Sequence, residues 1–275
     1  MKKQTSVASV VSVIILILLT VVFVFPFYWV ITGSFKEQMV TVKIPPEWFP
    51  LTPTFNNYST LFVRNPAMKW FFNTVIISSV AMALVCIVST MAGYVLAKKR
   101  FYGGTILFAM FVAAMALPKQ VVLVPLVQQA SQLGLHDSLW AVILPTVGWP
   151  FGIFLMKQFS QTIPKELLEA AKIDGCNEFQ IFKNIVITMV KPGIGALAIF
   201  TFINTWNDYF LQLIMLSSRD NLTLQLGIAT LQAELSTNYG VQMAGATFSA
   251  IPIILVFVLF QKSFTQGITM GAVKG

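Results

Sequence analysis

The chain has 275 residues, of which 56% are hydrophobic and only 10% are charged. This balance is too apolar for a water-soluble domain of this length, and it indicates a protein whose solvent is the lipid bilayer. The formal net charge of +8 is expected for basic loops that face anionic lipid, so it gives no reason to predict nucleic-acid binding.

Apolar stretches long enough to cross the bilayer recur along the chain. A helix needs about 20 apolar residues to cross roughly 30 Å of hydrocarbon. Four stretches without Asp, Glu, Lys or Arg meet this length: Gln4 to Phe35, Trp70 to Ala97, Ser138 to Met156 and Leu235 to Gln261.

Two further stretches each carry a single interrupting charge. Lys119 lies within Thr105 to Leu126, and Asp208 lies within Pro192 to Leu216. The sequence therefore predicts an all-α, polytopic membrane protein with six transmembrane helices.

The N-terminal region, residues 1–69, is predicted to form the first transmembrane helix and an outer loop. Lys2 and Lys3 precede the first apolar run as in a signal peptide, but the run is too long and lacks a small-residue cleavage pattern. The loop from Lys36 to Lys69 contains Pro45, Pro46, Pro50 and Pro53, which disfavour a long helix and predict a short, partly extended cap.

Basic residues predict the orientation, because cytoplasmic loops of membrane proteins are enriched in Lys and Arg. With both termini in the cytoplasm, twelve of the 18 basic residues fall on that side. They are Lys2, Lys3, Lys98, Lys99, Arg100, Lys157, Lys165, Lys172, Lys183, Lys191, Lys262 and Lys274. We therefore expect a multi-pass protein of the cytoplasmic membrane with both termini inside.

The cytoplasmic segment from Lys157 to Lys191 is predicted to form a helix-turn-helix. Pro164 suits the first turn of a helix, and Gly175 suits its C-terminal cap. Asn177 starts a second helix, with Gln180 three residues later as in a capping box.

The first of these helices has an apolar side formed by Leu167, Leu168 and Ala171. Two interpretations remain open. The side either docks a partner protein, because a lone membrane protein would leave it in water, or it packs beneath the chain's own helical bundle.

Polar residues recur every three to four positions in the fifth predicted span, which would place them on one helix face. They are Thr201, Asn204, Thr205, Asp208 and Gln212. This face would either line a solute path, where amides and hydroxyls suit a sugar, or hydrogen-bond to neighbouring helices.

The two charges that interrupt spans lie at similar predicted depths in their helices. A Lys119–Asp208 ion pair would offset the cost of placing either charge alone in the membrane. Snorkelling of each side chain to the surface is an equally valid interpretation.

Residue patterns for catalysis are absent from the sequence. No G-x-x-x-x-G-K-[ST] loop cradles phosphates, and the single histidine, His136, has no cluster of partners. The two cysteines, Cys86 and Cys176, lie at different predicted levels, so no disulfide framework is expected. The chain should not hydrolyse ATP by itself.

Glu169-Ala170-Ala171, three residues, Gly175, nine residues and Ile185 resemble the EAA loop of permeases from binding-protein-dependent ABC importers. The family's usual Leu and Pro at the end of this loop are replaced here, and Pro192 is expected to break the helix instead.

Three further stretches resemble the carbohydrate-uptake branch of that family, in particular the smaller maltose permease subunit type. They are Ala92 to Ala97 before a basic turn, Trp206-Asn207-Asp208-Tyr209, and the tail from Gln266 to Gly275.

The resemblance implies a type I ABC importer permease fold, with the transmembrane domain at 70–265, the EAA loop at 160–190 and a cytoplasmic tail at 266–275. It also implies a second, non-identical permease, two copies of a cytoplasmic ATPase and an external solute-binding protein as partners. ATP and Mg would be used by the ATPase, and no cofactor would be bound by this subunit.

The family places ATPase coupling in the EAA helix, which carries over to Glu169, Ala170, Ala171 and Gly175, with Leu167 and Leu168 beside them. In some members the tail also reaches the ATPase, which would involve Gly271, Ala272, Val273, Lys274 and Gly275. The solute implied is a sugar, a polyol or a sugar-phosphate. A secondary transporter or a channel-type subunit is the alternative, and the EAA spacing argues against both.

Overall fold

The computed structural model describes residues 7–234 and 238–272, and for residues 7–8, 232–234 and 259–272 it describes the backbone alone. The described backbone is made of helices, turns and bends. It divides into two compact units, Met1–Met68 with Gly227–Ile251 and Lys69–Leu226 with Pro252–Gly275.

The first unit is built around a long apolar helix and the segment that follows it. Its elements are α1 (Val7–Gly33), α2 (Gln38–Thr41), α3 (Asn56–Phe62), the first residues of α4 (Ala67–Lys98), most of α13 (Leu224–Glu234) and the start of α14 (Tyr239–Ala272). The buried Asn57 side chain donates hydrogen bonds of 2.8 Å to the carbonyls of Ser34 and Lys36. The predicted outer loop is therefore an ordered cap with two short helices.

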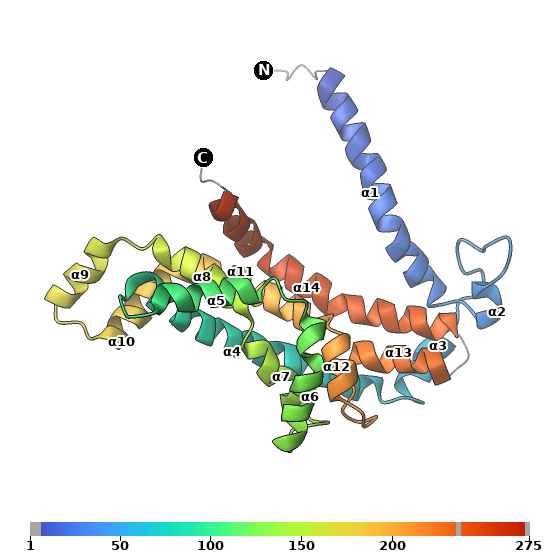
Figure 1. Cartoon of the computed structure of the whole chain (residues 1–275). Coiled ribbons are helices and arrows are strands. Elements are labelled where there is room, and N and C mark those ends of the chain that lie inside the picture. The colour runs from blue at the N-terminus through green and yellow to red at the C-terminus, as the bar shows by residue number, and fades with distance from the viewer. Residues whose placement is uncertain (1–6, 235–237, 273–275) are drawn as a thin grey trace. The chain divides into compact units, whose positions relative to one another are not determined.

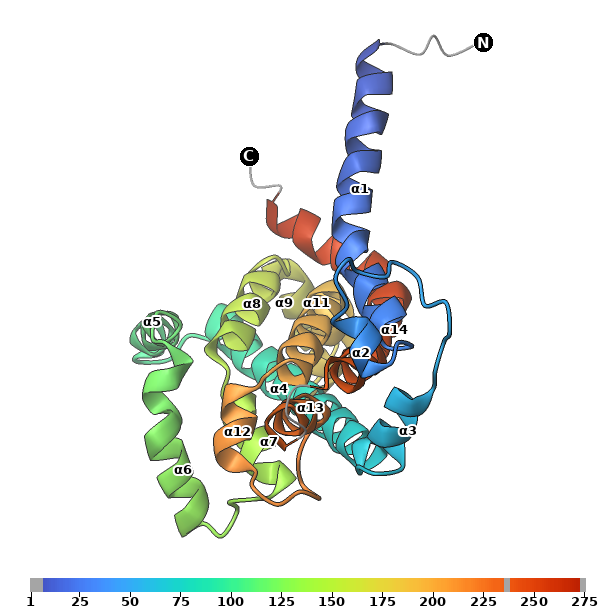
Figure 2. The same ribbon diagram turned by 90° about the vertical axis from the view of Figure 1, so that its right-hand side faces the viewer.

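The second unit contains the remaining helices. They are α5 (Gly104–Ala114), the 3-10 helix η1 (Lys119–Val122), α6 (Leu123–Gln132), α7 (Leu139–Val147), α8 (Pro150–Gln161), α9 (Lys165–Ile173), α10 (Glu178–Ile181), the π-helical η2 (Phe182–Val186), α11 (Ile187–Trp206) and α12 (Phe210–Met215). Helix α8 packs between α5 and α11 (Figure 2). Within this unit α9 and α10 lie at one end, and α6, α7 and α12 lie at the other (Figure 1).

Among the described residues, four helices are long and apolar enough to cross a membrane unbroken. They are Ser9–Gly33, Ala67–Lys98, Glu178–Trp206 and Tyr239–Val258. Two bent pairs raise the total to six if each counts as one span, namely Gly104–Ala114 with Lys119–Gln132, bent by 103°, and Leu139–Val147 with Pro150–Gln161, bent by 40°. The prediction of an all-α polytopic fold is confirmed, with two spans broken.

The third predicted span differs from the continuous helix that the sequence favoured. Helix α5 ends at Ala114, and Pro118 adopts an extended backbone with ψ 130° before η1 begins at Lys119. Proline lacks a backbone N–H and restricts the residue before it, so the helix cannot run through this position unchanged.

The fifth predicted span was wrong at both ends. The helix begins at Glu178, continues through the π-helical turn and ends at Trp206, with Pro192 inside α11 rather than at a break. A buried helix tolerates one proline because its neighbours and local adjustments of the helix satisfy the freed backbone groups. The chain instead breaks at Asn207 to Tyr209, about two turns before the predicted end at Leu216.

The final helix extends further than predicted. Helix α14 runs to Ala272, so residues 266–272 of the predicted tail continue it. Gly271 and Ala272 are described by their backbone alone, and Val273, Lys274 and Gly275 lie outside the described residues.

Candidate functional site

The α9–α10 hairpin has the local structure that its sequence predicts. Helix α9 follows the extended Pro164 and ends at Ile173, and Gly175 adopts a left-handed backbone with φ +81°. The Asn177 side chain accepts a hydrogen bond from the Gln180 amide at 2.9 Å, and the Gln180 side chain accepts one from the Asn177 amide at 2.8 Å. The predicted glycine turn and capping box are therefore confirmed.

The predicted apolar side of α9 is divided between the core and the surface. Leu168 is 9% exposed and Ala171 is 6% exposed, and both belong to a buried cluster that includes Met156, Ile163 and Ile181. Leu167 is 41% exposed, because adjacent helical residues point about 100° apart. Of the two interpretations left open, packing beneath the chain's own bundle holds for Leu168 and Ala171, which attach the helix to the core, while Leu167 stays exposed.

The outward face of the hairpin carries a different set of residues. Glu169 and Ala170 are exposed, and the large apolar side chains of Ile173 and Phe179 are 86% and 71% exposed. Sequence reasoning did not assign Ile173 to this face, although Leu167, Ala170 and Ile173 recur at a spacing of three. We call the four exposed residues Glu169, Ala170, Ile173 and Phe179 the outward face.

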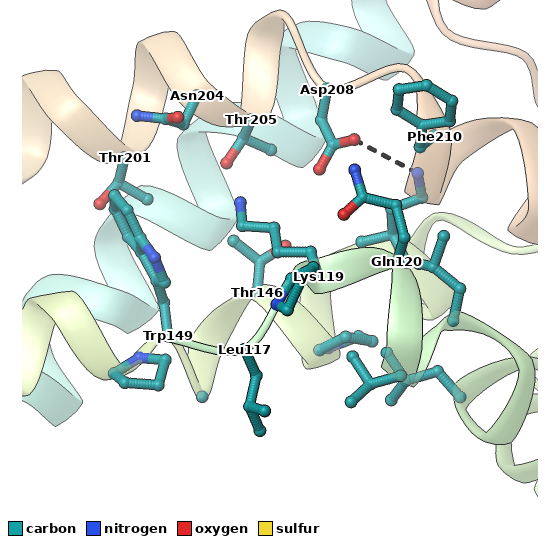
Figure 3. Close-up of a pocket in the computed structure, with 18 of the residues that line it drawn as sticks. Leu117, Lys119, Gln120, Thr146, Trp149, Thr201, Asn204, Thr205, Asp208 and Phe210 are labelled. Carbon is teal, nitrogen blue, oxygen red and sulfur yellow. Dashed lines mark hydrogen bonds between the residues drawn. The ribbon is translucent and has the colours of Figure 1, made fainter. Parts of the chain in front are cut away.

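A pocket of about 730 Å³ lies in the second unit, lined by residues of α6, α11 and α12 among others and by none of α9 or α10. It forms where three breaks between helices come together, between α5 and η1, between α7 and α8, and between α11 and α12. Its polar and aromatic lining includes Lys119, Gln120, Thr146, Trp149, Asn204 and Asp208 (Figure 3). Residues distant in sequence therefore meet in one cavity.

The five polar residues predicted to share one helix face do not share a helix. Thr201, Asn204 and Thr205 lie on α11, Asp208 follows its end, and Gln212 lies on α12. The first four nevertheless line the pocket.

Gln212 does not line the pocket but ties two segments together. Its fully buried side chain donates a 3.0 Å hydrogen bond to the Thr205 carbonyl and accepts one from the Thr223 hydroxyl. Of the two interpretations left open for these polar residues, Gln212 fits hydrogen bonding between segments, because the break at residues 207–209 turns its side chain into the protein.

The hydroxyls of Thr201 and Thr205 are buried in the pocket wall and have no hydrogen-bond partner within the described structure. Thr201 is 0% exposed and Thr205 is 3% exposed. A buried hydroxyl without a partner costs free energy, and because both oxygens lie beneath the surface of the wall, an occupant of the pocket would reach them only after a local movement.

The predicted ion pair between Lys119 and Asp208 is not formed in the part of the chain that the structure describes. The Lys119 ammonium lies 5.5 Å from the centroid of the Trp149 ring, and the Asp208 carboxylate accepts a 3.2 Å hydrogen bond from the Leu211 amide. Both charges line the same pocket, each with its own partner.

The hairpin and the pocket both lie within a segment that matches a known family. Residues 89–270 match the family described as binding-protein-dependent transport system inner membrane component. The chain therefore belongs to this family, the permease subunits of ABC importers, and within it to the carbohydrate-uptake branch.

Relatives and a solved structure agree over nearly the whole length. The chain is 34% identical to the arabinooligosaccharides transport system permease protein AraQ of Bacillus subtilis, covering 99% of this chain and 98% of that protein. It is 30% identical to the diacetylchitobiose uptake system permease protein DasC of Streptomyces coelicolor, with 92% of each chain covered.

One crystal structure shows the same fold. A chain of a bacterial ABC transporter involved in the import of the acidic polysaccharide alginate superimposes with a TM-score of 0.81, at 20% identity, over 96% of this chain and 99% of that chain. The type I ABC importer permease fold and the role of a membrane-spanning permease subunit, which is not itself an enzyme, follow from these similarities.

Proposed function

We propose that this chain, as one permease subunit, lets a sugar or a related polyol or sugar-phosphate cross the cytoplasmic membrane, driven by ATP hydrolysis in partner subunits. The proposed complex contains a second, non-identical permease, two copies of a cytoplasmic ATPase and an external solute-binding protein. Both termini and the α9–α10 hairpin would face the cytoplasm, as the basic residues predict.

The observation that carries this proposal is the outward face of the hairpin. Ile173 on α9 and Phe179 on α10 are large apolar side chains exposed to water, and Glu169, four residues before Ile173, is exposed as well. Exposed large apolar groups on a short helical hairpin are typical of a docking surface. Ala170 would permit close approach of the ATPase, and Gly175 would fix the direction in which the hairpin returns.

The division of α9 suits the transmission of force. Leu168 and Ala171 join the helix to the buried cluster that also contains Met156 of α8 and Val190 of α11. A displacement imposed on the outward face would therefore move the transmembrane helices, because close-packed interiors transmit strain.

We further propose that the pocket lies on the solute path. Non-helical backbone at membrane depth is tolerated where it is buried in protein or lines an aqueous cavity, and three helix breaks meet here. Transporters often bind substrate where helices are discontinuous.

The lining of the pocket suits a sugar. Asn204 and Asp208 offer hydrogen-bonding groups to sugar hydroxyls, and Trp149 offers a flat aromatic face. The names of the two relatives given above refer to arabinooligosaccharides and to diacetylchitobiose, which supports a saccharide as the solute of this chain.

The tail remains a separate proposal. Gly271 to Gly275 are small or flexible apart from Val273 and Lys274, and they would extend α14 toward the ATPase. Deleting residues 271–275 should reduce coupling of ATP hydrolysis to uptake, and a truncated complex with unchanged uptake and ATPase stimulation would show that the tail makes no functional contact.

The energy source separates an ABC importer from a secondary transporter or a channel. Uptake of labelled solute in whole cells should collapse when ATP is depleted and survive an uncoupler that removes the ion gradient. The opposite pattern would favour a secondary transporter, and uptake indifferent to both treatments would favour a channel. A thermal-shift ligand screen of the co-expressed binding protein would then identify the solute.

A further inference from the structure

The cytoplasmic end of α4 holds the α9–α10 hairpin from both sides. Lys98 is the last residue of this helix and Lys99 follows it; Lys98 contacts the chain just before the hairpin, and Lys99 contacts the second arm of the hairpin. Neither lysine belongs to the hairpin, the outward face or the pocket.

Lys98 binds the chain where it enters the hairpin. Its ammonium donates hydrogen bonds to the carbonyl of Gln161 at 3.0 Å and to that of Ile163 at 2.5 Å. Gln161 is the last residue of α8, whose final carbonyls lack partners within the helix. A cation at this negative end is favourable, so Lys98 fixes the point from which α9 departs.

Lys99 binds the second arm of the hairpin at its start. Its ammonium forms a 2.5 Å ion pair with Glu178, the first residue of α10, and Lys172 of α9 approaches the same carboxylate at 3.4 Å. Burial lowers the pKa of Lys99, but the hydrogen bond and charge of Glu178 outweigh it and leave this pKa above its ordinary value. The ammonium therefore stays charged at neutral pH.

Gly93 and Tyr94, about one turn before the end of α4, pack this helix closely against α8 and η2. A Cβ atom at Gly93 would lie 2.6 Å from the backbone of Met156 and Lys157, so α4 and α8 approach each other as closely as glycine allows. The buried Tyr94 ring packs 5.8 Å from the Phe182 ring of η2. The Lys99 ammonium also lies 5.5 Å from the centroid of the Tyr94 ring.

We propose that Lys98 and Lys99 form a two-point clamp that makes the hairpin and α4 move as one body, and that this clamp transmits hairpin displacement to the transmembrane helices. The inference rests on the proposed coupling function and adds two positioning residues to it. Without the clamp, the apolar contacts of Leu168 and Ala171 would still attach the hairpin to the bundle but would leave its arms free to pivot.

The test uses the permease within its full transporter complex in vesicles. Lys98→Met and Lys99→Met remove the donors while keeping the length of the apolar stem, and Lys98→Arg and Lys99→Arg restore a cation. Lys183→Met is the matched control, because Lys183 is an exposed lysine of the adjacent η2. The readouts are ATP hydrolysed per solute imported and backbone hydrogen exchange across residues 165–181.

Both Met variants should assemble normally, raise the ATP cost per imported solute about threefold to tenfold, and speed hairpin exchange about fivefold, since each loses charge-assisted hydrogen bonds. The Arg variants should recover most of the coupling, and the Lys183 control should match the wild type. The loss in Lys99→Met combined with Glu178→Gln should be smaller than the sum of the two single losses, because both changes break the Lys99–Glu178 pair, while Glu178→Gln also breaks the longer Lys172 contact.

Unchanged ATP cost in both Met variants would overturn the clamp, even if the variants were less stable. If the losses in the Lys99→Met/Glu178→Gln combination are additive, the Lys99–Glu178 pair is not part of the clamp. A wild-type complex that imports solute without hydrolysing ATP would instead overturn the proposed function, so the two failures are distinguishable.

Discussion

The hairpin and the pocket are built by opposite means. The hairpin takes its shape from neighbours in sequence, since Pro164, Gly175 and the Asn177–Gln180 capping box define its ends within about 20 residues. The pocket depends on Lys119, Trp149 and Asp208, which come from three distant segments and meet where helices break. The proposed coupling element is thus locally encoded, and the proposed solute site is purely tertiary.

This difference predicts that changes in the hairpin should affect energy coupling while leaving the pocket intact. Changes in the pocket should impair uptake while leaving the hairpin and its coupling intact. The predictions below test this separation, beginning with the largest expected effect.

Replacing Leu168 by Asp should detach the hairpin from the core. The substitution places a charge among buried apolar side chains, which costs several kcal/mol, on the order of 3 or more. We expect loss of ATPase binding in pull-down assays and protease cleavage within residues 161–181. Leu167→Asp is the matched control, because its side chain is 41% exposed and should leave the hairpin folded. Equal damage by both changes would contradict the division of α9 into core and surface.

Removing the aromatic wall or an amide of the pocket should impair uptake without uncoupling the complex. Trp149→Ala and Asn204→Ala should each lower the uptake rate about tenfold, a loss near 1.4 kcal/mol, while ATPase binding and protein level stay normal. Initial uptake rates and ATPase pull-down measure the two properties. Gln212→Ala should instead lower thermal stability, because Gln212 bonds to Thr205 and Thr223 rather than facing the pocket. Wild-type uptake in Trp149→Ala would place the solute elsewhere.

Lys119 and Asp208 should act independently. Each has its own partner in the pocket wall, so the losses in Lys119→Gln and Asp208→Asn should add within about 0.5 kcal/mol in the double variant. Uptake rates of the single and double variants give the coupling energy. A double variant less impaired than the sum would restore the ion pair that the sequence first indicated.

The smallest effect is expected in the loop between α6 and α7. The Asp137 carboxylate accepts hydrogen bonds from the amides of Ser217 and Ser218 at 2.8 and 3.0 Å and from the Ser218 hydroxyl. Partial burial raises the pKa of Asp137, but these hydrogen bonds outweigh it and lower the pKa from 3.8 to about 2.

A depressed pKa means that this contribution is fully present above pH 4 and is lost as the pH falls toward 2. Asp137→Asn should therefore lower thermal stability by about 1 kcal/mol at neutral pH, with little change in uptake. Melting curves of the variant and the wild type at pH 4 to 8 provide the check. A difference that grows between pH 5 and pH 8 would contradict the assignment.

The sequence predicted what short-range chemistry determines. The position of Gly175 at a helix end is enough to predict its positive φ. The spacing of three residues between Asn177 and Gln180 is enough to predict the capping box. Length and apolar content located the spans, because the bilayer sets both.

The remaining features depend on contacts that are not local in sequence. Pro118 and Pro192 both occur in apolar stretches, yet only the first stands at a helix break. The surrounding helices determine whether a proline breaks its helix, and the periodicity of a single sequence carries no information about those neighbours. For the same reason, the sequence made Gln212 a candidate for the solute path. It indicated no role for Lys98 and Lys99 beyond the orientation of the chain in the membrane.

The most direct test of the account is the effect of Gly175→Val and Glu169→Lys on coupling. Val at Gly175 would strain a left-handed backbone by about 1 kcal/mol or more and tilt α9. Glu169→Lys would place a cation on the outward face where the partner meets an anion. Both variants should insert and fold in the membrane, because neither alters a span.

The measurement is binding-protein-stimulated ATP hydrolysis and solute uptake in the same reconstituted vesicles, with ATPase pull-down alongside. We predict that both activities fall together in both variants while the pocket variant Asn204→Ala loses uptake alone. Wild-type uptake and ATPase retention in Gly175→Val and Glu169→Lys would contradict the assignment of coupling to the hairpin.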